Sequence, residues 1–178
     1  MSFSYFLGAN TGAGFVSLYA QFPPEEGAML HILKGSPGGG KSTLLRRIGA
    51  LCEERGLEVQ YVVCSGDPDS LDGVYVPALH EAWADGTAPH VIEPKCFGAD
   101  ADYVDLSRFL RLPMSAEDRE RARSLTQSYR AHYQNAYAEL AEAKRLHDAL
   151  ESVYRPYLDF DALDAYTESV LEQLRARL

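Results

Sequence analysis

The sequence predicts an α/β fold with three layers around a small parallel β-sheet, followed by an all-helical C-terminal extension. A compact apolar run at 29–34 leads through a glycine-rich turn into a helix-forming stretch at 44–54, and a second strand-like run follows at 57–64. No glycine or proline occurs between Pro113 and Pro156, which predicts one long helix. The 178 residues correspond to one domain with an elaboration, because a typical domain has about 150.

The N-terminal half supplies the strands. Residues 15–19 alternate in the manner of an edge strand, and the run at 29–34 precedes the glycine-rich turn. Gly56 is placed to end the first helix, so a βαβ unit is complete by Cys64. A third strand is predicted at 80–85, whereas turn-forming and acidic residues predict mainly loops over 65–94.

A sheet of this kind needs about five strands, and only three are clearly predicted, with two weaker candidates. We therefore expect the N-terminal segment, the long helix or a second copy of the chain to complete the core. An exposed sheet edge favours a homodimer.

Two helices are predicted after Pro113. Ser115 is placed to cap the long helix, and Asp161 to cap a last helix with its apolar residues on one side. In the long helix an apolar stripe recurs every three or four residues, at Leu125, Tyr129, Tyr133, Tyr137 and Leu140. This spacing favours helix packing over the stacking of nucleic-acid bases. The predicted domains are thus a core at 1–113 and a helical extension at 114–178, packed on or projecting from that core.

Composition restricts the class of protein. Lys and Arg number 17 against 26 Asp and Glu, a net charge of 17 − 26 = −9, which does not favour a nucleic-acid binder with a broad basic face. No Lys or Arg precedes Lys34 and no apolar run reaches the roughly 18 residues of a membrane span, so no membrane contact is expected. The three cysteines are an odd number without C-x-x-C spacing, which favours the cytoplasm over a disulfide-bonded exterior.

One motif carries chemistry. Residues 35–42, Gly-Ser-Pro-Gly-Gly-Gly-Lys-Ser, match G-x-x-x-x-G-K-[ST] at each fixed position, between a predicted strand and a predicted helix. Such a P-loop binds phosphates through backbone N–H groups and a helix N-terminus. Lys41 is expected to reach the β- and γ-phosphates and the Ser42 hydroxyl to ligate Mg²⁺, so the cofactors predicted are ATP and Mg²⁺. The predicted nucleotide-binding residues are Gly35, Ser36, Pro37, Gly38, Gly39, Gly40, Lys41, Ser42 and Thr43.

Phosphoryl chemistry also needs a carboxylate near Mg²⁺. Asp85 ends a short apolar run and is predicted as a Walker B ligand of the metal, together with Ser42. Asp67 follows the second strand and is predicted to overlook the P-loop, since ligands collect at the carboxyl ends of parallel strands. The predicted catalytic residues are Lys41, Asp67 and Asp85. The alternative is that Asp67, Asp69 and Asp72 satisfy their own backbone in turns.

Other side chains have two interpretations each. His90 is a candidate contact to nucleotide or substrate, although a lone histidine beside a strand is more often packed. His31 is interpreted as a core residue. Lys95 and Arg108 are candidate phosphate clamps or ordinary surface cations.

The chain resembles the N-terminal half of a family of bacterial ATP-binding proteins built from two tandem P-loop modules, described mostly as ATPases of unknown role. The resemblance spans about residues 8–97 and rests on four strings: Gly8-Ala-Asn-Thr-Gly12 with Gly14-Phe15, then residues 33–43, 64–73 and 85–92. It implies a cytoplasmic ATP-binding module, and assured roles carry over only to the P-loop residues. The second module does not follow in this sequence, so a short relative or half of a longer protein is expected.

Three functions follow from these observations. The leading one is an ATPase or ATP-dependent switch, whose 65–73 and 85–94 loops report the nucleotide state and whose helices face a protein partner. The second is a small-molecule or nucleotide kinase in which Asp67 activates an acceptor hydroxyl. The third is a nucleotide-stabilised scaffold without turnover, completed by a second P-loop module. A GTPase is disfavoured because no N-K-x-D or T-K-x-D string is present.

Overall fold

The computed structural model describes all 178 residues and has an α/β fold with a mixed six-stranded sheet and three α-helices. The helices are α1 (Lys41–Glu53), α2 (Ala116–Tyr154) and α3 (Phe160–Arg175). The strands are β1 (Phe3–Tyr5), β2 (Gly8–Thr11), β3 (Gly14–Ser17), β4 (Met29–Lys34), β5 (Gln60–Val63), β6 (Leu71–Val76), β7 (Glu81–Asp85) and β8 (Ala101–Asp105). Strands β2 and β3 form a separate hairpin.

The sheet has the order β1-β5-β6-β7-β4-β8. Strand β6 runs antiparallel to both of its neighbours, whereas β1 is parallel to β5, and β7 and β8 are parallel to β4. The prediction of a parallel sheet was therefore wrong at β6. The connection between β5 and β6 is only residues 64–70, and a parallel crossover needs a dozen or more residues, so β6 returns beside β5 as a hairpin.

The predicted strands at 29–34, 57–64 and 80–85 correspond to β4, β5 and β7. The N-terminal segment adds β1 at one edge, as expected. Strand β6 lies where mainly loops were predicted, and β8 at the opposite edge was not predicted. Both strands carry aspartates, which are depleted in strands generally, and this weakened their signal.

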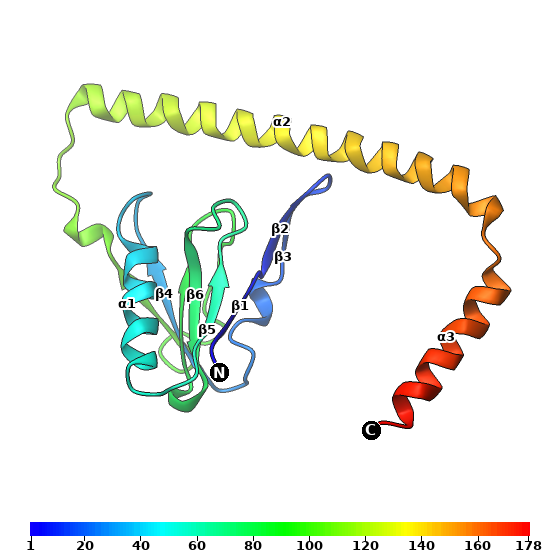
Figure 1. The fold of residues 1–178 in the computed structure, drawn as a ribbon. Helices are drawn as coiled ribbons and strands as arrows, with labels where there is room; N and C mark the ends of the chain where they lie inside the picture. Colours follow the sequence, from blue (N-terminus) through cyan, green and yellow to red (C-terminus); the bar gives the residue numbers. More distant parts are fainter.

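The hydrophobic core lies in two clusters, one on each face of the sheet. On one face, α1 packs through Leu45 and Cys52 against Leu33, Val74 and strand neighbours. On the other face, the segments before β4 and after β7 cover the sheet with Tyr19, Phe22 and Ile92. Figure 1 shows α1 on one side of the sheet only. The predicted three-layer arrangement is thus reduced to one helical layer, and irregular segments cover the second face.

Helix α2 begins as predicted, because the Ser115 hydroxyl accepts a hydrogen bond from the Asp118 N–H at 3.0 Å. It passes over the end of the sheet and meets the tip of the β2–β3 hairpin (Figure 1). There the Tyr137 hydroxyl donates to Asn10 Oδ1 at 3.0 Å. The cap of α3 is Asp159, which accepts from the Ala162 N–H, so the prediction of Asp161 was wrong by two residues.

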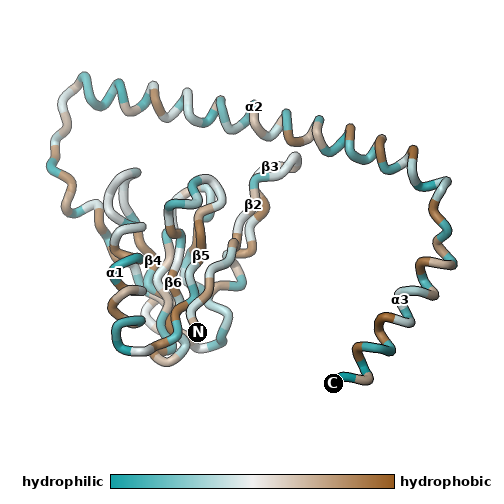
Figure 2. Tube along the Cα trace, in the orientation of Figure 1, coloured by the Kyte–Doolittle hydropathy of each residue, from teal (hydrophilic) through white to brown (hydrophobic).

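Neither α2 nor α3 has a buried residue. In the predicted stripe, Tyr133 and Tyr137 are half-buried beside the hairpin and the loop after β5, whereas Leu125, Tyr129 and Leu140 are exposed. Hydrophobic residues recur along both helices away from the core (Figure 2). None of the helices combines the length and the apolar character that crossing a membrane requires.

Candidate functional site

The loop between β4 and α1 is shaped by its glycines. Gly38 and Gly40 have φ angles of +70° and +87°, which side chains other than glycine rarely adopt. A Cβ at Gly39 would lie 2.9 Å from the carbonyl oxygen of Ser36. The backbone at residues 35–40 therefore forms a tight concave turn in which each of the three consecutive glycines is required.

Helix α1 opens directly out of this turn. Gly40 is its N-cap and supplies no side-chain hydrogen bond. The N–H groups of Lys41, Ser42 and Thr43 do not donate to the preceding loop. These N–H groups carry the positive end of the helix dipole, so the turn and the helix together offer an anion site.

Lys41 occupies this turn. Its side chain is 9% exposed, and its Nζ donates to the carbonyl oxygens of Gly35 and Ser36 at 3.0 and 3.1 Å. The same Nζ lies 3.6 Å from Asp85 Oδ2. An ammonium with only neutral carbonyls and one carboxylate around it remains able to attract an anion.

Asp85 reaches Lys41 because β7 is the parallel neighbour of β4. The pairing of the two strands ends with Leu33 opposite Asp85, so the carboxylate stands where the glycine-rich loop begins. The Thr87 N–H and hydroxyl donate to Asp85 Oδ1 at 2.9 and 2.6 Å and fix the orientation of the carboxylate. The Ser42 hydroxyl is a second side-chain oxygen near this turn, and its Oγ accepts a hydrogen bond from the Leu71 N–H at 2.9 Å.

Asp67 is not brought to this group by any hydrogen bond or ion pair. It is exposed, and its Oδ1 accepts from the Asp69 N–H at 3.1 Å, while its carbonyl accepts from the Ser70 N–H. This is the turn geometry that was the alternative interpretation for Asp67. The three strands β5, β6 and β7 are consecutive in the sheet, so Asp67 follows a strand that is two places away from β7.

Asp72 is buried in β6 and is not a turn residue, so the alternative interpretation is wrong for this aspartate. Its carboxylate accepts from the Tyr19 hydroxyl at 2.8 Å and lies 3.5 Å from His90 Nε2. The register of β5 and β6 shifts between Val62 and Val63, and Asp72 is the residue that this bulge leaves unpaired. Bulges re-aim side chains. The available signal was an acid inside the apolar run of residues 71–76.

Burial alters the ionisation of both Asp72 and Tyr19. Desolvation raises the pKa of Asp72, Asp85 raises it further, and His90 and the Tyr19 hydrogen bond oppose the shift. Burial and the neighbouring Asp72 raise the pKa of Tyr19 above its ordinary range. Tyr19 is therefore a neutral donor at physiological pH, whereas Asp72 is ionised only at the expense of desolvation.

His90 is packed and not exposed. It is 6% exposed and its ring stacks on Tyr19 with 4.8 Å between centroids. Neither ring nitrogen has a hydrogen-bond partner. His31 is partly buried, stacks on Trp83 and pairs with Asp102 at 2.7 Å, as expected of a residue satisfied within the fold.

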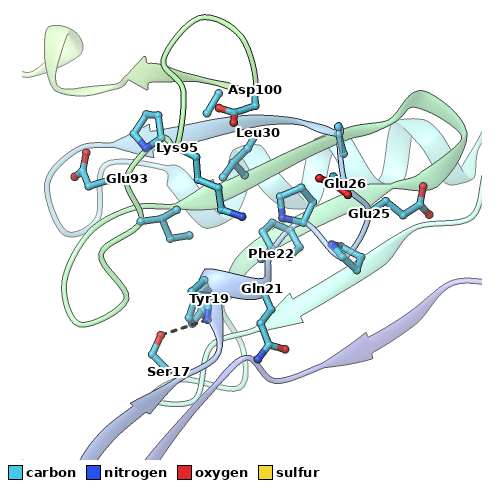
Figure 3. Close-up of a pocket in the computed structure, with 18 of the residues that line it drawn as sticks. Ser17, Tyr19, Gln21, Phe22, Glu25, Glu26, Leu30, Glu93, Lys95 and Asp100 are labelled. Atoms are coloured by element: carbon cyan, nitrogen blue, oxygen red, sulfur yellow. Dashed lines mark hydrogen bonds between the residues drawn. The ribbon is translucent and has the colours of Figure 1, made fainter.

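The two candidate phosphate clamps lie elsewhere. Lys95 lines a cavity of about 650 Å³ between the segment before β4 and the segment after β7 (Figure 3). Arg108 lies over the ring of Phe109 after β8. Tyr19 lines this cavity and also donates to Asp72, so the cavity borders the buried acids.

The chain was compared with protein-family models, with curated proteins and with solved structures, and none of them matches it.

Proposed function

We propose that this protein binds Mg·ATP at the 35–43 loop in a P-loop NTPase-like fold and acts as an ATPase or an ATP-dependent switch. The observation that carries the proposal is the position of Lys41, at the uncapped start of α1 and 3.6 Å from a carboxylate on the neighbouring parallel strand. Strand, glycine-rich turn, helix and adjacent carboxylate are the parts that phosphoryl chemistry uses.

The donor groups fit a nucleotide with its metal. Free N–H groups of Lys41, Ser42 and Thr43 suit phosphate oxygens, and the Lys41 ammonium suits their charge. Ser42 and Asp85 would hold Mg²⁺, since hydroxyl and carboxylate oxygens are the ligands that this ion prefers. The ion would neutralise phosphate charge. Asp85 enters this proposal by its contact with Lys41, whereas the predicted catalytic role of Asp67 gains no support from its exposed turn.

A route from the nucleotide to the rest of the chain starts at Ser42. Its hydroxyl oxygen accepts from the N–H that opens β6, directly before Asp72. A change in what Ser42 binds therefore acts on β6 and on the loop at residues 64–70. This loop contacts Tyr133 of α2, so the long helix is placed to respond.

The test is thermal unfolding of the full chain with Mg·ATP, Mg·ADP and Mg·GTP. A ligand at 100 times its Kd adds about 2.7 kcal/mol to the free energy of unfolding. For a chain of this size the transition should rise by about 5–10 °C with adenine nucleotides. In the Lys41→Ala variant this rise should disappear, because the variant lacks the ammonium that lies in the turn.

Lys95→Ala is the matched control, since this exposed lysine lies outside the loop and should leave the nucleotide shift unchanged. An equal shift in Lys41→Ala and the unaltered chain would refute the proposed site. ATP consumption without an added acceptor would then identify an ATPase, and nucleotide binding without consumption a scaffold.

A kinase is the second candidate, and the cavity is the space that the structure offers for an acceptor. The cavity in Figure 3 is lined by four carboxylates, those of Glu25, Glu26, Glu93 and Asp100, against the single ammonium of Lys95. A space of this size beside Tyr19 suits a small acceptor with hydroxyl or amino groups. Release of ADP only after such an acceptor is added would select the kinase over the ATPase.

A further inference from the structure

Asp72, Asp85 and His90 form a buried cluster, of which the proposed nucleotide site uses only Asp85. One ligand atom from each residue lies within 4.8 Å of the other two. The pairing of β6 with β7 ends at Gly73 and Ala84, and the two aspartates are the next residue on each strand. His90 joins them from the segment after β7. Three elements thus deliver two carboxylates and one imidazole to the same buried point.

The charges within this cluster do not balance. Lys41 lies near Asp85, whereas the only ionisable base near Asp72 is His90, at 3.5 Å. The side chains of Asp72 and Asp85 are 7% and 14% exposed. Buried charges are normally paired or bound to a metal, so a cation between these carboxylates would supply what is missing.

His90 independently indicates a ligand. Only 6% of its surface is exposed, and both ring nitrogens lack a hydrogen-bond partner. Buried polar groups in proteins nearly always have one. Nε2 faces Asp72 Oδ1 at 3.5 Å, a separation at which both atoms can bind one ion placed between them.

A second group of ligand atoms, His147, Asp148 and Glu151 on α2, does not share these features. All three side chains are exposed, Asp148 pairs with Lys144 at 2.8 Å, and His147 pairs with Glu151 at 3.2 Å. No group in it is buried without a partner.

We infer that Asp72, Asp85 and His90 bind a divalent transition-metal ion, of the Mn²⁺ or Zn²⁺ class, in the absence of nucleotide. An imidazole nitrogen with two carboxylate oxygens suits these ions, whereas Mg²⁺ prefers oxygen ligands alone. Three protein ligands leave a position open for water or a phosphate oxygen. The site shares Asp85 with the proposed nucleotide site but rests on Asp72 and His90.

The test uses the full chain and Mn²⁺ alone, in a His147→Ala background that removes the exposed α2 group. Electron paramagnetic resonance of free Mn²⁺ should give one bound ion per chain. Electron spin-echo modulation of the bound ion should show coupling to an imidazole ¹⁴N. His90→Gln should abolish this coupling and weaken binding on the order of tenfold or more, and Asp72→Asn should weaken binding similarly.

His80→Ala is the matched control, because this exposed histidine pairs with Glu25 and should not alter Mn²⁺ binding. Lys41→Ala should retain Mn²⁺ binding while losing nucleotide, so failure of the metal site and failure of the nucleotide site are distinguishable. Absence of saturable binding, or of ¹⁴N coupling, in the His147→Ala chain overturns the inference without requiring a variant of the cluster to fold. Unchanged Mn²⁺ affinity in folded His90→Gln would overturn it as well.

Discussion

Asp85 and Asp67 are both acidic, but only Asp85 lies beside Lys41, because its strand pairs directly with β4. Asp85 is the last residue of β7, the direct neighbour of β4, whereas Asp67 follows β5, which does not pair with β4. Its carboxylate is held by Thr87 and lies beside Lys41, whereas the carboxylate of Asp67 closes its own turn. The two residues are therefore a natural pair for a substitution experiment.

Asp85→Asn should weaken the Mg²⁺ dependence of ATP binding, because the amide lacks the charge that a hard cation requires. We expect a loss of about tenfold or more in Mg²⁺ affinity, the scale of about 1.4 kcal/mol, measured by titrating Mg²⁺ at fixed ATP. Asp67→Asn is the control and should leave the titration unchanged. The opposite pattern would give the metal-binding role to Asp67.

At the scale of elements, α2 is attached to the core through few contacts. The hydrogen bond from Tyr137 to Asn10 is one of them, the close approach of Gly12 to Ala141 is another, and Tyr133 lies against Gly66 in the loop after β5. A Cβ at Gly12 would lie 2.6 Å from Ala141 Cα, which is backbone and cannot rotate away. The hairpin tip therefore holds the helix by steric fit.

Gly12→Val should separate α2 from the hairpin without disturbing the sheet. We expect faster hydrogen exchange of the β2–β3 amides and faster proteolysis between β8 and α2, because local contacts there set the opening free energy. Ala13→Val, at an exposed neighbouring position, is the matched control and should alter neither measurement. Equal protection in both variants would mean that the helix is not held at Gly12.

At the scale of the whole molecule, burial is confined to the first part of the chain. Every buried residue lies between Gly8 and Ala101, and the apolar residues of α3 are exposed throughout. Helices α2 and α3, which lie in the predicted extension at 114–178, contain no buried residue. These two helices therefore add little to the hydrophobic core.

A chain of residues 1–113 should therefore unfold as one cooperative unit. Loss of the Tyr137 hydrogen bond removes about 1 kcal/mol, which lowers the midpoint by about 4–8 °C for a chain of that length. Calorimetry of the shortened and full chains measures the difference. A shortened chain without a cooperative transition would show that α2 is required for the core.

Some parts of the structure have local signals, and these could be predicted from the amino-acid sequence alone. Interactions between residues that are close in the chain form the glycine-rich turn, the start of α2 at Ser115 and strands β4, β5 and β7. Local sequence patterns therefore predict these elements. The carboxylates that lie beside Lys41 and His90 could not be predicted in this way, because they depend on how the strands are arranged in the sheet. The short connection at residues 64–70 makes β6 antiparallel to β5, and the bulge between these strands turns Asp72 inward. The physical reason is that strand order and register arise from packing between residues far apart in the chain, which no local pattern of polar and apolar residues encodes.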